Sequence, residues 1–226
     1  MMILYAHVNR TSPNTLKLRA ALAEAGARYE YRAVDLDAGE QKRPAFLALN
    51  PHGKIPVLVD GDFVLAESDA ILWYIGERHP AAPLLPSWQA PGGREGGGSG
   101  GEQIAIQARA RVAQWCAFSS TGLYQTFLDL YIHTVRGTPE TRVRWIGEAA
   151  AQKMDRLLAV MDGVLARLPY LAGDFSLADL AAAAVLQTVK TRLPVDRTTG
   201  RDAIADWYGR VTARPAWQRA LEDVSP

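Results

Sequence analysis

The chain has 226 residues, 48% hydrophobic and 22% charged, which is typical of one or two globular domains with a buried core. Its 25 Lys and Arg residues nearly balance 24 Asp and Glu residues, so the charge indicates neither nucleic acid nor a membrane surface as a partner. One cysteine excludes an intrachain disulfide, four scattered histidines predict no metal site, and the lack of a signal peptide or a membrane-length apolar run predicts a cytoplasmic protein.

The first 80 residues alternate short strand patterns with helical ones. Runs of apolar, aromatic or β-branched residues predict strands, and the turn Asp60-Gly61-Asp62 joins the last two as a hairpin. The predicted strands are 3–5, 29–34, 57–59 and 63–65. Apolar residues at helical spacing predict the helices 13–25, 43–49 and 68–78. This order predicts an α/β domain over residues 1–80, with a mixed sheet and helices on its faces.

The composition changes sharply after this domain. Residues 81–101 are rich in Pro and Gly and predict a flexible linker. Residues 102–226 show no strand pattern, and their periodicity predicts an all-α helical bundle. The predicted helices of the bundle are 102–134, 138–168, 177–190, 202–212 and 215–223.

Ser12 and Pro13 open the first predicted helix. Serine is a preferred N-cap and proline is favoured at the first helical position, so a hydroxyl lies at the positive end of the helix. Asn14 falls in the same turn. Simple capping explains the pair, whereas the functional alternative is an anion or thiolate held by the hydroxyl and the free N–H groups.

Residues 50–58, Asn-Pro-His-Gly-Lys-Ile-Pro-Val-Leu, form the second candidate site. The Ile55-Pro56 bond is a candidate cis peptide at the entry to a strand. A residue before such a proline leaves its N–H and C=O groups free to pair with a peptide, and Lys54 could bind a carboxylate. The alternative is an ordinary loop with an exposed lysine.

Glu67 and Ser68 precede the third predicted helix. Ser68 is predicted as its N-cap, so a carboxylate ligand could lie at the helix end while Glu67 pairs with an ammonium group. Capping alone would also explain Ser68.

With these motifs in order, the chain resembles the glutathione transferase superfamily over nearly its whole length. The resemblance rests on residues 50–58, on Glu67-Ser-Asp-Ala-Ile71 and on the Ser-x-x-Asp capping box within Gly173-Asp-Phe-Ser-Leu-Ala-Asp179. It implies a thioredoxin-like N-terminal domain that binds glutathione, and an all-α C-terminal domain that shapes the second-substrate site. It also implies a homodimer, for which an Arg-rich first bundle helix with Arg109 and Arg111 would supply contacts.

The resemblance assigns glutathione-binding roles by position. Lys54 would meet the glycine carboxylate, the Ile55 backbone before a cis Pro56 would pair with the cysteinyl segment, and Glu67 with Ser68 would hold the γ-glutamyl end. His52 belongs to the same motif and to the same predicted binding set.

The resemblance also suggests a catalytic set. Ser12 falls where thiol-active members carry cysteine and zeta-like members carry serine, and Ser12-Pro-Asn14 is similar to the Thr-Pro-Asn of nu-class bacterial members. Tyr5 lies close to the place where other classes carry a catalytic tyrosine, so Ser12, Asn14 and Tyr5 all remain candidates. A serine hydroxyl cannot deprotonate a thiol, but it can hydrogen-bond a thiolate and lower the thiol pKa from about 8.5.

The predicted second-substrate site comprises Asn9, Trp115 and Tyr124. The stretch 115–127 resembles the beta-class helix that carries an active-site histidine, with Tyr124 at that position. Cys116 on the same helix is predicted as a small core residue.

The resemblance implies a bacterial serine-type enzyme, zeta-, nu- or beta-like, that adds glutathione, as its co-substrate, to a small electrophile in detoxification. Two alternatives stay open: a glutathione-dependent isomerase of the maleylacetoacetate type, and a non-catalytic binding or regulatory protein on the same fold.

Overall fold

The computed structural model describes residues 1–8, 12–88 and 99–222. Its sheet has the strand order β2-β1-β3-β4. The central strand β1 (Met2–His7) pairs in parallel with β2 (Tyr29–Val34) and antiparallel with β3 (Val57–Asp60), and β3 forms a hairpin with β4 (Phe63–Ala66). The predicted mixed sheet is confirmed.

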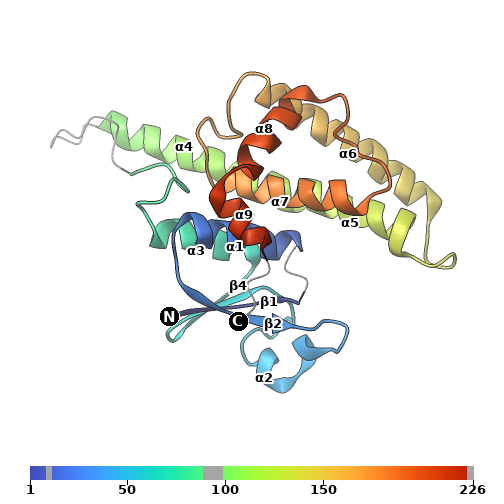
Figure 1. Ribbon diagram of the computed structural model, residues 1–226, viewed down its shortest axis with the longest axis horizontal. Coiled ribbons are helices and arrows are strands. Elements are labelled where there is room, and N and C mark those ends of the chain that lie inside the picture. The colour runs from blue at the N-terminus through green and yellow to red at the C-terminus, as the bar shows by residue number, and fades with distance from the viewer. Residues whose placement is uncertain (9–11, 89–98, 223–226) are drawn as a thin grey trace.

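Helices lie on both faces of this sheet. Helices α1 (Pro13–Glu24) and α3 (Ser68–Arg78) lie between the sheet and the bundle, and the short α2 (Pro44–Leu47), preceded by the 3₁₀ turn η1 (Glu40–Lys42), covers the opposite face (Figure 1). Side chains alternate along β1 because a strand has a period of two. Leu4 and Ala6 are therefore buried in the main core, whereas Tyr5 packs with Phe46 of α2.

The second half is helical, as predicted. One long helical stretch comprises α4 (Ser99–Ala117), the π-helical segment η2 (Phe118–Tyr124), α5 (Gln125–Tyr131) and the π-helical segment η3 (Ile132–Arg136). It is followed by α6 (Arg144–Leu165), α7 (Leu177–Arg192), α8 (Asp202–Thr212) and α9 (Pro215–Leu221). Helix α7 occupies the centre, and α1 packs against both α7 and α9, which joins the two halves.

The predicted helix 138–168 begins six residues later, at Arg144. The Thr138 N–H donates to the Thr141 hydroxyl at 2.8 Å, and the Val143 N–H donates to Nδ1 of His133 at 3.0 Å. These side chains accept hydrogen bonds from backbone N–H groups in a turn. Such side-chain hydrogen bonds compete with helix formation.

The first part of the predicted linker is packed. Leu84 is fully buried, and its carbonyl oxygen accepts a hydrogen bond of 2.9 Å from the N–H of Leu177, at the start of α7. Helix α4 begins at Ser99, three residues before the predicted helix start at residue 102. The glycine-rich residues 91–98 lie outside the described part of the chain.

A buried carboxylate organises the centre of the bundle. The predicted capping box is present at the start of α7, where Asp179 accepts the Ser176 N–H at 2.9 Å. Asp179 also accepts the Leu171 N–H at 3.1 Å and the indole N–H of Trp207 at 2.8 Å. Burial raises the pKa of Asp179 to about 6. Nearby Cys116 is a core residue, as predicted, and burial raises the pKa of its thiol to about 12.

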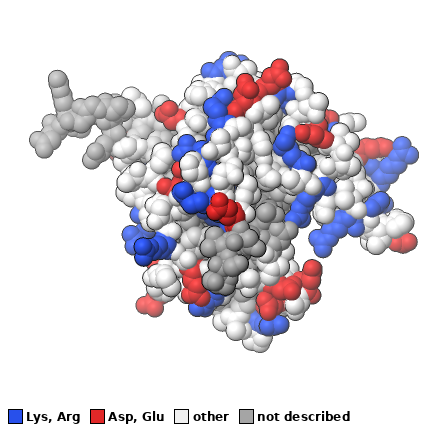
Figure 2. Space-filling view, viewed as in Figure 1, with Lys and Arg blue, Asp and Glu red and all other residues white. Residues whose placement is uncertain are grey.

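Charged side chains of both signs are interspersed over the surface seen in Figure 2, in keeping with a net charge of +1. None of the described helices is long and apolar enough to cross a membrane. Within the same residues, no group of three His, Cys, Asp or Glu side chains is placed to hold a metal ion.

Candidate active site

A cavity of about 720 Å³ lies between the two halves. The N-terminal domain supplies one wall from α1, the loop before β3 and the start of α3, and η2 and α5 of the bundle supply the other. Of the sequence-predicted site residues, it brings together Asn14, Lys54, Ile55, Pro56, Glu67, Ser68 and Tyr124.

The loop before β3 is held by the side chain of Asn50. Its amide nitrogen donates to the Lys54 carbonyl oxygen at 2.7 Å, and its amide oxygen accepts the His52 N–H at 3.1 Å. The Ile55-Pro56 peptide is cis, as predicted. The loop thereby presents Lys54 and Ile55 to the cavity, whereas His52 is exposed and does not line it.

Gly53 is required by close packing in this loop. It has a φ of +59°, and a Cβ atom there would lie 2.9 Å from both the Gln41 carbonyl oxygen and Lys42 Nζ. We expect Gly53→Ala to lower the free energy of unfolding by about 1–2 kcal/mol through left-handed strain alone. It should also weaken glutathione binding severalfold, because it displaces two cavity-lining residues.

Gly61→Ala is the matched control, because Gly61 has a φ of +61° and a Cβ atom there would meet nothing within 4 Å. Denaturant unfolding should show destabilisation of both variants, larger in Gly53→Ala because of the contact with the Gln41 carbonyl oxygen, and glutathione titration should show loss of affinity in Gly53→Ala only. Equal glutathione affinity in both would show that the Gly53 contact does not shape the cavity.

The start of α3 differs from the prediction by one residue. Glu67, not Ser68, is the N-cap, and its φ of +65° is unusual for a residue other than glycine. Ser68 is the first helical residue, so its backbone N–H belongs to the unpaired donors at the positive helix end. Both side chains line the cavity.

A buried ion pair supports this helix end. Lys17 of α1 has a side chain only 4% exposed, and its ammonium lies 2.5 Å from the carboxylate of Asp69. The pair joins α1 to α3 directly beside Ser68. It also offsets the charge of Asp69, which would otherwise repel a carboxylate at the helix start. Lys17 was not among the predicted site residues, because nothing in a helical pattern distinguishes a buried lysine from a solvated one.

Ser12 is the N-cap of α1, and Pro13 is the first helical residue, as predicted. The Ser12 carbonyl oxygen accepts the Leu16 N–H at 2.8 Å, but its hydroxyl makes no capping hydrogen bond. Asn14 lines the cavity two residues further on, whereas Ser12 is not among the described lining residues. Asn9 lies outside the described part of the chain.

The bundle wall of the cavity is formed largely by the π-helical segment η2. Ser120, Thr121 and Tyr124 line it, followed by Gln125 and Leu128 of α5. Short π-helical turns are frequent at functional sites. Tyr124 is half-buried, and burial raises the pKa of its phenol. The wall thus places hydroxyl- and amide-bearing side chains in the same cavity as Asn14 and Lys54.

Comparison with known proteins identifies the family. The model of the glutathione S-transferase N-terminal domain matches residues 2–77, and that of the C-terminal domain matches residues 133–215. Glutathione S-transferase 3 of Zea mays is 33% identical over 219 residues, covering 93% of this chain and 89% of the relative. The chain belongs to the glutathione S-transferase family.

A solved relative has the same overall structure. The theta class glutathione S-transferase of Xanthomonas axonopodis pv. citri, determined with glutathione bound, matches with a TM-score of 0.79 at 30% identity, covering 99% of both chains. Glutathione S-transferase F10 of Arabidopsis thaliana is 31% identical, covering 96% of this chain and 95% of the relative. The predicted superfamily is confirmed, and the similarity extends over both domains of the transferase.

Two predicted site residues lie elsewhere in this transferase. Trp115 packs edge-to-face on Phe118, at 4.9 Å between ring centroids, and lines a separate cavity on the bundle with Val160 of α6. Tyr5 lies on the α2 side of the sheet, where its hydroxyl accepts a hydrogen bond of 2.6 Å from Arg32. Adjacent residues of a strand point to opposite faces of the sheet. A tyrosine close in sequence to the expected catalytic position can therefore lie on the other face.

The placement of Tyr5 leads to a prediction. Tyr5→Phe should leave both the pKa of bound glutathione and the turnover within about twofold of wild type, because the hydroxyl lies outside the interdomain cavity. Thiolate absorbance and initial rates measure the two quantities. A tenfold fall in turnover would return Tyr5 to the catalytic set.

Several cavity residues were not predicted, among them two that precede α2. Gln41 and Lys42 line the cavity from η1. The Gln41 side-chain oxygen is buried without a hydrogen-bond partner among the described residues, so it is available to a ligand N–H group. In the sequence, the only signal for these residues is that they belong to a polar stretch before α2. Such a stretch is equally typical of a solvated loop.

Proposed function

We propose that this chain is a glutathione transferase that binds glutathione in the interdomain cavity and adds its thiolate to a small electrophile. The observation that carries the proposal is that one cavity joins the start of α1, the cis-proline loop and the start of α3 to the hydroxyl-bearing wall of the bundle. The family membership supports the same activity.

The N-terminal wall suits each part of the tripeptide. Lys54 supplies a positive charge for the glycine carboxylate. The Ile55 backbone offers its N–H and C=O groups to the cysteinyl segment. Glu67 would pair with the γ-glutamyl ammonium group, while Ser68 and the helix start bind the γ-glutamyl carboxylate.

The thiolate would form at the start of α1. The Ser12 hydroxyl, unused in capping, and the Asn14 amide would donate hydrogen bonds to the sulfur, and the helix dipole would add a further positive potential. These interactions favour the charged form of the thiol and so lower its pKa. Catalysis then rests on thiolate stabilisation and on positioning of the electrophile, to which Tyr124 contributes from the opposite wall.

We further propose that the chain is a serine-type member that acts as a cytoplasmic homodimer in detoxification. A hydroxyl-bearing Ser12 in place of cysteine supports a serine-type member. The family also supports a homodimer and a cytoplasmic role in detoxification. Arg109 was expected at the dimer contact, but this residue is buried within its own chain, where it pairs with Glu77 and donates to the Pro86 carbonyl oxygen. Exposed apolar side chains on β4 and α4 offer better contacts: Phe63, Val64, Ile104 and Ile106.

Glutathione titration tests the binding role. Glu67→Gln should raise the dissociation constant for glutathione about tenfold, because it removes a charge from the ammonium site, while the pKa of the bound thiol stays within a few tenths. Glu102→Gln, an exposed change on α4, is the control. Absence of calorimetric binding or of a thermal shift by wild type at millimolar glutathione would contradict the transferase assignment.

A further inference from the structure

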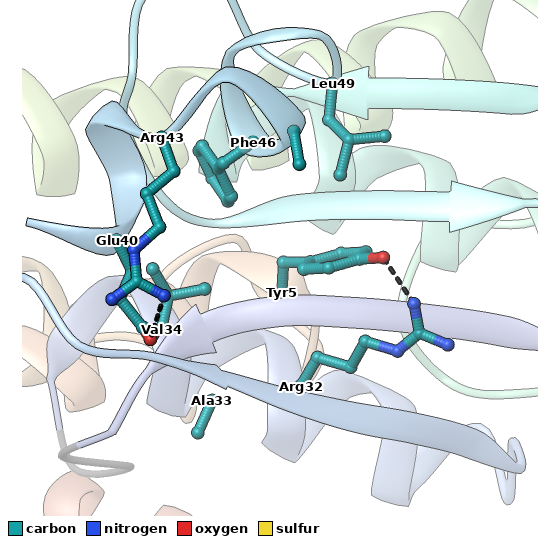
Figure 3. Close-up of a pocket in the computed structure, with 9 residues that line it drawn as sticks. Tyr5, Arg32, Ala33, Val34, Glu40, Arg43, Phe46 and Leu49 are labelled. Carbon is teal, nitrogen blue, oxygen red and sulfur yellow. Dashed lines mark hydrogen bonds and ion pairs between the residues drawn. The ribbon is translucent and has the colours of Figure 1, made fainter.

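A second cavity of about 500 Å³ lies on the face of the sheet that α2 covers. Such a volume is in the range of small-molecule sites. Strands β1 and β2 form its floor, and η1 and α2 form its rim (Figure 3). Among the described residues, none lines both this cavity and the glutathione cavity. We call it the α2 groove, defined by Tyr5, Arg32, Glu40, Arg43, Phe46 and Leu49.

The centre of the α2 groove is aromatic. The rings of Tyr5 and Phe46 meet edge-to-face, with 6.2 Å between centroids and 75° between planes. Phe46 is buried and Tyr5 is half-buried, and Leu49 extends the apolar surface (Figure 3). An open surface of this kind favours a flat ring, which can stack on or meet the edges of both aromatic side chains.

Guanidinium groups flank this aromatic centre. Arg43 lies at one end and Arg32 at the other (Figure 3), and the Arg32 guanidinium carbon lies 5.3 Å from the centroid of the Tyr5 ring. Arg32 is largely engaged, because it donates to Glu30 and to the Tyr5 hydroxyl. Arg43 donates one of its five N–H groups to Glu40, at 3.0 Å, and its side chain is 62% exposed.

Glu40 is the one carboxylate among the described residues that line the α2 groove, and it is already occupied. Besides the hydrogen bond from Arg43, Glu40 accepts the Asp35 N–H at 2.9 Å, so both of its oxygens have a donor. Two arginines and one glutamate leave the lining with a charge of +1. Donors for an anion therefore remain, and the groove has no free acceptor for a cation among its described carboxylates.

We propose that the α2 groove binds a planar aromatic molecule that carries a carboxylate or sulfonate. The ring packs against Tyr5 and Phe46, and the acid group is bound by Arg43, whose guanidinium matches the planar geometry of such anions. This site is separate from the catalytic cavity, and it gives Tyr5 a binding role in place of a catalytic one.

Calorimetric titration with naphthalene-2-sulfonate tests the proposal. The protein is first saturated with glutathione sulfonate, which fills the glutathione site without adding a ring. We expect saturable binding of one naphthalene-2-sulfonate per chain at the α2 groove, and at least tenfold weaker binding of the neutral 2-naphthol. Absence of saturable binding, or equal affinity for the neutral ring, overturns the proposal.

Variants then locate the site. Arg43→Gln should weaken naphthalene-2-sulfonate binding at least fivefold, and Ala45→Trp should abolish it by filling the groove from an exposed position that needs no core rearrangement. Arg28→Gln removes an exposed charge outside the groove and should change nothing. Unchanged affinity in both groove variants would place the ligand elsewhere and refute the site. Transferase activity should persist in both groove variants. A failure of the groove proposal can therefore be distinguished from a failure of the proposed transferase function.

Discussion

Replacing Ser12 by alanine should reduce turnover roughly ten- to a hundredfold near neutral pH while leaving glutathione affinity nearly unchanged. The hydroxyl is proposed to contact only the sulfur, and a hydrogen bond to a charged group contributes about 1.5–3 kcal/mol. The thiolate form loses this stabilisation, so the pKa of the bound thiol rises by about one to two units. Ultraviolet thiolate absorbance as a function of pH measures that pKa directly.

Ser12→Thr is the matched control, because it keeps a hydroxyl at the N-cap of α1. We expect it to retain most of the turnover and a thiol pKa close to wild type. Some activity should also survive in Ser12→Ala, since Asn14 and the helix start remain. If Ser12→Ala leaves the thiol pKa unchanged, Ser12 is only a helix cap, and Asn14 becomes the main donor.

Replacing Asp179 by alanine should cause the largest loss of stability, about 3 kcal/mol in the free energy of unfolding. The variant leaves three buried N–H donors without their acceptor, and each costs about 1–3 kcal/mol, partly offset because a buried carboxylate is removed. The donors are the backbone N–H groups of Leu171 and Ser176 and the indole of Trp207. Denaturant unfolding measures the loss, and Asp174→Ala, at an exposed position in the same loop, should cost little.

The pKa of Asp179 determines how the stability difference between wild type and Asp179→Ala depends on pH. Burial raises it to about 6, above its ordinary value of 3.8, so the folded state binds a proton more tightly than the unfolded state. The contribution to stability is therefore largest at acid pH and is lost as the pH rises from about 4 to 6. The stability gap between wild type and Asp179→Ala should narrow over that range. A gap that widens instead would show that the three donors dominate over burial.

Local signals in the sequence predicted much of this structure. Strand 29–34, helix 68–78, the hairpin, the capping box of α7 and the cis Ile55-Pro56 peptide each depend on residues close together in the chain. The two segments that were predicted to bind carboxylates also line one cavity. Each lies where a loop enters a strand or a helix, so its conformation depends on residues close together in the chain.

The sequence offered no guide to placement where tertiary packing decides. The face on which Tyr5 lies depends on the register of β1 against its neighbours, and a shift of one residue reverses it. Trp115 and Tyr124 are nine residues apart on one helical stretch, but the π-helical segment η2 between them rotates the helix faces, which a period of 3.6 does not reveal. Gln41 and Lys42 reach the cavity only because Gly53 allows the loop to pack against them.

A crystal structure with glutathione bound tests the central claim most directly. We expect the γ-glutamyl carboxylate at the backbone of Ser68, the ammonium group at Glu67, the glycine carboxylate at Lys54, and the sulfur within hydrogen-bond distance of Ser12 or Asn14 at the start of α1. Glutathione bound outside the interdomain cavity, or bound inside it with its sulfur directed away from the start of α1, would contradict that claim.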